Sequence, residues 1–124
     1  MADFYYHITK PENLESILET GLKANSEGQI FLFDNVSISL NGTTNSVADC
    51  IAKNQIFLDE YAMLEISSEG ILTELLPDNV GELSEKFQYI AMQNFIDERF
   101  INVFGIHKTQ YKPFFQIPTT FDNP

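Results

Sequence analysis

The sequence predicts an α+β fold, in which short strands form a sheet and helices pack at its edges. Short apolar and aromatic runs typical of strands recur along the chain, whereas helical spacing of apolar residues occurs only twice, both times in the first half. Because strands and helices do not alternate regularly, a doubly wound parallel sheet is not expected. A chain of 124 residues is expected to form one domain, spanning residues 1–124.

The first strand and the first helix are predicted within residues 4–22. Residues 4–8 read as a strand that carries one polar residue, His7. Thr9 and Glu12 have the spacing of a capping box, which predicts that a helix begins here, and Gly21 is typical of the residue at which a helix ends. His7 is therefore expected at a strand-to-helix corner, where a side chain can contact a ligand.

The later elements are predicted from shorter patterns. Residues 29–33 are typical of a buried strand, and the polar stretch 37–45 contains the turn dipeptide Asn41-Gly42. Residues 46–53 have helical spacing, with Ser46 or Asn45 as the cap. The pattern at residues 71–76 is ambiguous between a strand and a helical turn. Further strands are expected at residues 61–66, 87–92 and 100–106.

The composition excludes several classes of protein. Hydrophobic residues make up 44% of the chain, which favours a packed core over disorder, yet no apolar run approaches the roughly 20 residues needed to cross a bilayer. The N-terminal residues lack the pattern of a signal peptide, and the single cysteine, Cys50, allows no internal disulfide framework. We expect a cytoplasmic protein with no membrane partner, in which Cys50 is a buried thiol.

The net charge of −11 bears on possible partners. It comes from 18 acidic against 7 basic residues, so general nucleic-acid binding is disfavoured. The charge serves solubility in the simplest interpretation; in a second one, the acidic surface meets a basic partner protein or imitates nucleic acid.

Several chemical motifs are missing from the sequence. It contains no glycine-rich phosphate loop and no nucleophile elbow, and His7 and His107 lie too far apart for a zinc-type spacing. No bound metal is therefore expected. Taken alone, His7 has a structural interpretation as well as a functional one.

The order of the predicted elements resembles the ADP-ribosyltransferase-like fold. The resemblance rests on the first strand with His7, on Asn-Leu-x-x-Ile-Leu-x-x-Gly-Leu at residues 13–22, on the strand at 29–33, and on the strand at 61–66. It covers roughly residues 4–104. The chain is most similar to small bacterial and phage branches that include DNA-targeting and rifamycin ADP-ribosyltransferases, and tRNA 2′-phosphotransferase shares this fold. The resemblance implies split antiparallel sheets around an NAD⁺ cleft with flanking helices.

The resemblance also implies roles for residues of the first two strands. His7 would hydrogen-bond the adenosine ribose of NAD⁺, and the backbone beside it, at Ile8 or Tyr6, would grip the nicotinamide amide. Phe31 would stack on the nicotinamide ring in place of the family's tyrosine, although a structural role in the core is an equal alternative for this ring. The same strands would bring Thr9 and Phe33 to the cofactor.

The catalytic carboxylate of the family has two candidate counterparts. The late strand of the family begins near a Glu that stabilises the oxocarbenium-like transition state, and the best alignment places Gln88 there. Gln88 supplies no charge. Glu85 lies three residues earlier and would share a face with Tyr89, opposite Gln88. Either residue could occupy the pocket.

The expected function is an NAD-dependent ADP-ribosyltransferase that transfers ADP-ribose to an unidentified acceptor, protein or nucleic acid. The main alternative is a catalytically inactive relative that uses its acidic surface to bind a partner protein, and an unrelated α+β binding domain is a third. A phosphotransferase acting on tRNA is disfavoured, because that chemistry uses several arginines and this chain has only Arg99. The aromatic tail, residues 111–124, is expected to pack on the core, with partner docking as the alternative.

Overall fold

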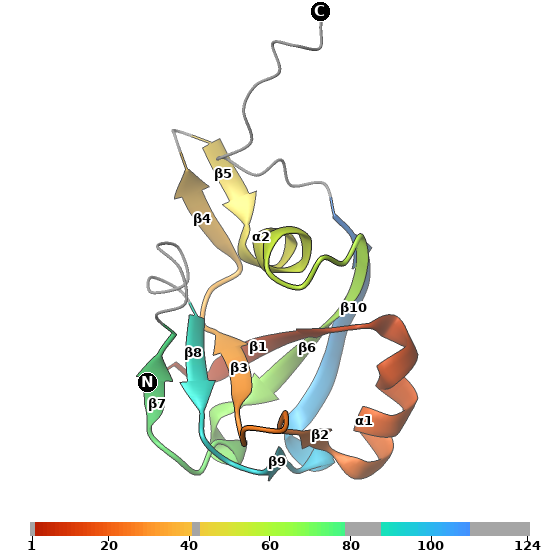
Figure 1. Ribbon diagram of the computed structural model, residues 1–124, viewed down its shortest axis with the longest axis vertical. Helices are drawn as coiled ribbons and strands as arrows, with labels where there is room; N and C mark the ends of the chain where they lie inside the picture. The colour runs from red at the N-terminus through yellow and green to blue at the C-terminus, as the bar shows by residue number, and fades with distance from the viewer. Residues whose placement is uncertain (1, 41–42, 79–87, 110–124) are drawn as a thin grey trace, which may run out of the picture.

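The protein has an α+β fold built on a six-stranded antiparallel sheet (Figure 1). The computed structural model describes residues 2–40, 43–78 and 88–109. The strand order of the large sheet is β10-β6-β1-β3-β8-β7. Its strands are β1 (Phe4–Thr9), β3 (Ile30–Phe33), β6 (Glu60–Ser67), β7 (Leu75–Pro77), β8 (Gln88–Ala91) and β10 (Ile101–Lys108).

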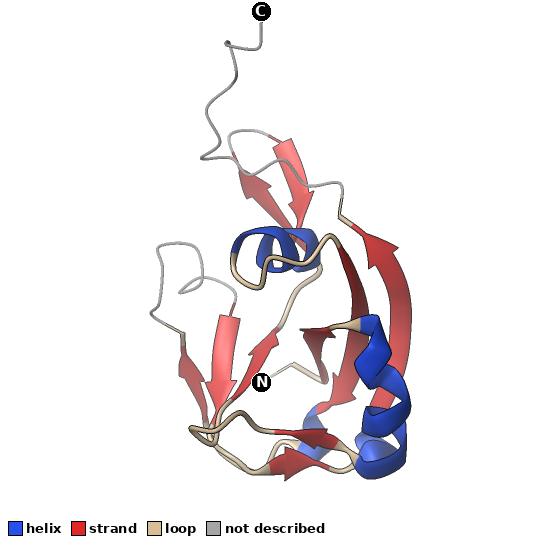
Figure 2. Ribbon diagram, turned by 45° about the vertical axis from the view of Figure 1, so that its right-hand side comes forward, coloured by secondary structure: helices blue, strands red, loops and turns tan. Residues whose placement is uncertain are grey.

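Two small antiparallel sheets and two α-helices accompany the large sheet. One small sheet pairs β2 (Leu22–Lys23) with β9 (Phe95–Ile96), and the other pairs β4 (Ser37–Leu40) with β5 (Thr43–Ser46). The helices are α1 (Leu14–Thr20) and α2 (Val47–Asn54). Single 3₁₀ turns occur at η1 (Pro11–Asn13), η2 (Ser68–Gly70) and η3 (Glu98–Phe100). In Figure 2, α2 lies beside the β4–β5 hairpin and α1 lies close to β2 and β9.

Most elements predicted from the sequence are confirmed. Strands occur at all four expected places after the first, and α2 begins after Ser46, whose Oγ accepts a hydrogen bond from the backbone N–H of Asp49 at 3.2 Å. Helix α1 ends at Gly21, which has a φ of 94°. The Asn41-Gly42 dipeptide and residues 111–124 lie outside the described residues.

The predicted capping box is wrong. The chain forms the 3₁₀ turn η1 first, and α1 begins only at Leu14. Lys10 stands before Pro11 in an extended conformation, as expected for a residue that precedes proline. Thr9 is consequently too early to cap a helix, and its Oγ1 instead accepts a hydrogen bond from Asn13 Nδ2 at 3.0 Å.

Two further features differ from the prediction. The polar stretch 37–45 contributes the strands β4 and β5, and the ambiguous region around residue 75 contains the edge strand β7. Helix α2 packs on the second cluster at one face of the sheet, and Ile17 of α1 belongs to the first cluster at the other face. Buried side chains alternate between two clusters along the strands, because successive residues of a strand point to opposite faces.

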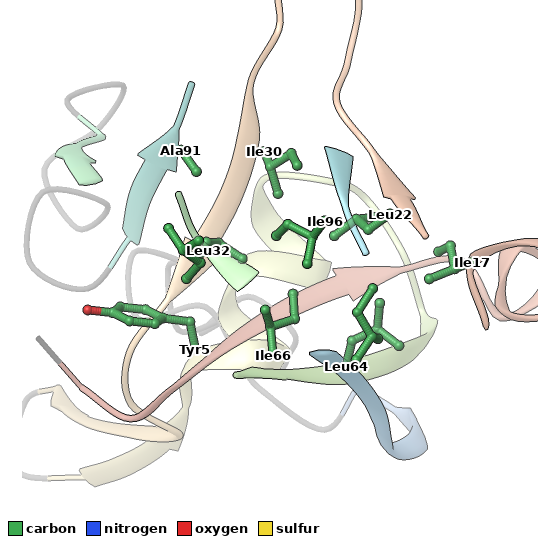
Figure 3. Packing of buried hydrophobic residues seen from close by; sticks show 11 residues of the cluster. Tyr5, Ile17, Leu22, Ile30, Leu32, Leu64, Ile66, Ala91 and Ile96 are labelled. Atoms are coloured by element: carbon green, nitrogen blue, oxygen red, sulfur yellow. The ribbon is translucent and has the colours of Figure 1, made fainter. Parts of the chain in front are cut away.

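The two clusters define the core. The first contains Ile17 of α1 together with residues of β2, β3, β6 and β9 (Figure 3). The second lies on the opposite face, where α2 covers Ile8, Phe33 and Met63. None of the described helices is long and apolar enough to cross a membrane.

The pairing of β1 with its two neighbours is uneven. Antiparallel pairing with β6 runs along the whole of β1, whereas a single register pair, Tyr6 with Phe33, joins β1 to β3. The large sheet therefore consists of two three-stranded halves, β10-β6-β1 and β3-β8-β7, that meet at one position. His7 follows this position directly.

Candidate functional site

His7 has a fixed tautomer. Its Nδ1 lies 2.7 Å from the backbone O of Phe31. A carbonyl oxygen only accepts hydrogen bonds, so Nδ1 carries the proton and donates it. Burial lowers the pKa of His7 below its ordinary value, although the bond to Phe31 opposes this shift. The ring is therefore neutral near pH 7, and Nε2 is left with a lone pair that can accept a hydrogen bond from a ligand.

A pocket of about 270 Å³ opens beside His7. Its walls come from three consecutive pieces of chain: the end of β1, the η1–α1 segment and β2. The described lining residues are mostly polar and include no carboxylate. They are His7, Thr9, Asn13, Ser16, Ile17, Gly21, Leu22 and Lys23.

Local structure holds these walls in place. The hydrogen bond from Asn13 to Thr9 fastens η1 to the end of β1. At the other end of α1, the turn at Gly21 directs the chain into β2, which pairs with β9. A Cβ on Gly21 would lie 2.6 Å from the backbone O of Ile96, so only glycine allows this close approach. The pocket walls at both ends of α1 are therefore held by hydrogen bonds to neighbouring strands.

Gln88 lies on the other face of the sheet from His7. Tyr6 pairs with Phe33, and Phe33 pairs with Gln88, so these three side chains point to one face. The Gln88 side chain is 5% exposed, and its Oε1 has no hydrogen-bond partner among the described residues. A buried polar atom without a partner is costly and is a feature of sites that receive a ligand. Glu85, the alternative catalytic candidate, lies outside the described residues.

The remaining predicted residues have separate surroundings. Ile8 and Phe33 are buried under α2 in the second cluster, so any contact they make with a ligand would come from their backbone. The Phe31 side chain is partly exposed, and its carbonyl orients His7. Thr9 is the only one of these four that lines the pocket with His7.

Sequence reasoning missed three polar residues of the pocket, namely Asn13, Ser16 and Lys23. Asn13 and Ser16 belong to the segment already singled out for its helical pattern, and their separation of three residues would have placed them on one face of a helix. Lys23 had no comparable signal, because its position depends on the turn at Gly21 and on the pairing of β2 with β9.

Neither a metal cluster nor a known family explains the site. Among residues 2–40, 43–78 and 88–109, no group of three or more His, Cys, Asp or Glu side chains could hold a metal ion. In comparisons with known proteins, no family model matches this chain, and no curated protein matches it significantly.

Proposed function

We propose that this protein binds NAD⁺ at the junction of β1 and β3 and acts as an ADP-ribosyltransferase of the ADP-ribosyltransferase-like fold. The order of the elements, with a histidine in the first strand and a glycine-terminated helix after it, supports this proposal. The division of the sheet into two halves at a single register pair is consistent with the split sheets of that fold.

The observation that carries the proposal is the hydrogen bond from His7 Nδ1 to the Phe31 carbonyl. It leaves Nε2 as an acceptor at the wall of a polar pocket. A ribose hydroxyl can donate the matching hydrogen bond. An ionised phosphate or carboxylate oxygen has no proton to donate and would be repelled by the lone pair of Nε2. The His7 ring is thus suited to hold the adenosine ribose of NAD⁺.

The two halves of NAD⁺ would lie on opposite sides of the β1–β3 junction. His7 and Gln88 flank the Tyr6–Phe33 pair from opposite faces of the sheet. A dinucleotide that passes between β1 and β3, beside their single register pair, would therefore meet His7 with one ribose and Gln88 with the other. The Gln88 Oε1, which lacks a partner within the described part of the chain, would accept a hydrogen bond from a hydroxyl of the nicotinamide-side ribose.

The proposed reaction transfers ADP-ribose. The bond between ribose C1′ and the nicotinamide nitrogen breaks, and nicotinamide leaves with the electron pair. A nucleophilic acceptor then bonds to C1′ and gives up its proton to solvent. Positive charge develops at C1′ during this step, and a carboxylate would stabilise it more than the neutral Gln88 amide does. Slow turnover is expected for this reason.

A non-catalytic NAD⁺-binding module is the second candidate. The neutrality of Gln88 favours it, because His7 and its pocket would still bind the nucleotide when catalysis is absent. In this case the function would be to bind a partner protein through the acidic surface.

Release of nicotinamide from NAD⁺ distinguishes the two candidates. We expect slow release by the wild-type protein, loss of release in His7→Ala, and release faster by at least about tenfold in Gln88→Glu, since one well-placed charge is worth several kcal/mol. Gln55→Glu, in the exposed end of α2, adds the same charge away from the site and is the control. If the wild type and Gln88→Glu both bind NAD⁺ but leave it intact, the result would support the non-catalytic module and contradict the transferase.

A further inference from the structure

Lys23 is a cation that lines the pocket beside His7 in a strongly acidic protein. Lys53 pairs with Asp59 at 3.0 Å, and Arg99 lies 3.7 Å from Asp97. Within the described parts of the chain, no carboxylate pairs with Lys23, even though acidic residues outnumber basic ones by 18 to 7. Lys23 instead lines the pocket beside His7, where the other lining residues carry no charge near pH 7.

His7 and Lys23 offer a ligand two different kinds of polar group. At His7, a ring nitrogen accepts a hydrogen bond, so the ligand presents a hydroxyl there. At Lys23, a compact ammonium group offers three donors, which suits an anion and in particular a phosphate. A ligand that joins a hydroxyl-bearing sugar to a phosphate meets both requirements.

The size of the pocket limits how much of a ligand it holds. About 270 Å³ is below the range of roughly 300–1,000 Å³ that is typical of sites for whole drug-sized ligands. A dinucleotide would therefore fill this pocket with one nucleotide half and extend beyond it with the other.

We propose that Lys23 binds the phosphate of the adenosine half and makes this pocket selective for a 5′-phosphorylated ribonucleoside. This inference rests on the proposed NAD⁺ site and names the part of the ligand that the pocket recognises. AMP, ADP and ADP-ribose bind here on their own, whereas adenosine, which lacks the phosphate, binds weakly.

Isothermal titration of AMP and adenosine tests the role of Lys23. We expect the wild-type protein to bind AMP at least about tenfold more tightly than adenosine, as a charge-assisted hydrogen bond predicts. Lys23→Met removes this difference and leaves adenosine affinity unchanged, and Lys23→Arg restores most of it. Lys108→Met, at the end of the edge strand β10, makes the same change in net charge and should leave both affinities unchanged.

Three results would overturn the inference: no AMP binding by the folded wild type, equal weakening of AMP and adenosine in Lys23→Met, or the same loss of AMP affinity in Lys108→Met. A failure of the proposed function can be distinguished from a failure of this inference. AMP binding that depends on Lys23, together with absent NAD⁺ cleavage, would refute the transferase and leave this inference standing. NAD⁺ cleavage that proceeds at the same rate in Lys23→Met would support the transferase and contradict this inference.

Discussion

At the scale of single residues, the state of His7 decides what the pocket can bind. The ring must be neutral for Nε2 to accept a hydrogen bond, and burial favours this state by lowering the pKa of His7. The bond to Phe31 selects the tautomer. Protonation of Nε2 would replace the acceptor by a donor and place a positive charge in a partly buried position.

The lowered pKa of His7 makes stability depend on pH. The unfolded chain, with an ordinary histidine pKa near 6.5, binds a proton more readily than the folded protein does. The contribution of His7 is therefore complete above about pH 6.5 and is lost as the pH falls through the lower folded pKa. In urea unfolding at pH 7.5 and pH 5, the wild type should lose more stability than His7→Asn. An equal loss in both proteins would contradict a buried neutral ring.

At the scale of elements, the turn between α1 and β2 shapes the pocket. Gly21 combines a φ of 94° with a close approach to Ile96, whereas Gly28 has a φ of 75° and open space around its Cα. Gly28→Ala should cost about 1 kcal/mol for its backbone conformation alone. Gly21→Ala should cost roughly 2–4 kcal/mol, because it adds a steric clash. Chemical unfolding of both variants measures the difference, and equal costs would show that the contact with Ile96 is unimportant.

A hydrogen bond between two side chains attaches helix α2 to the sheet. The Tyr61 hydroxyl of β6 donates a hydrogen bond to the Asp49 carboxylate, and burial and this carboxylate both raise the pKa of Tyr61. Tyr61→Phe should lower the free energy of unfolding by about 1–3 kcal/mol, the usual contribution of a hydrogen bond to a charged group. Asp49→Asn in the same background should then cost less than it does in the wild type. Additive costs in this double-mutant cycle would mean that the two side chains are not coupled.

At the scale of the whole molecule, the two halves of the large sheet share one register pair between β1 and β3. A ligand that crosses this junction would hold both halves at once. Hydrogen exchange with and without NAD⁺ should therefore show added protection in β1 and β3 together, beyond that of the pocket wall in α1. Protection confined to β1 and α1 would indicate that only the adenosine half is bound.

The sequence predicted five strands of the large sheet and both helices because each carries a local signal, whereas the short strands β2, β4, β5 and β9 were not predicted. Periodic apolar residues mark α2, and the turn at Gly21 follows directly from the residue type. Contacts between distant segments had no such signal. The bond from His7 to the Phe31 carbonyl, the pairing that places Lys23 at the pocket, and the opposite orientation of Gln88 all depend on strand register, which is set only when the sheet assembles.

Titration of NAD⁺ into wild-type and His7→Ala protein, followed by calorimetry up to millimolar ligand, tests the central claim most directly. The account predicts one-to-one binding by the wild type and at least about a tenfold loss of affinity in His7→Ala, the expected effect of losing one hydrogen bond in a partly buried site. Equal thermal unfolding curves for the two proteins would show that the fold is intact. Absence of binding to folded wild type, or unchanged affinity in His7→Ala, would contradict the account.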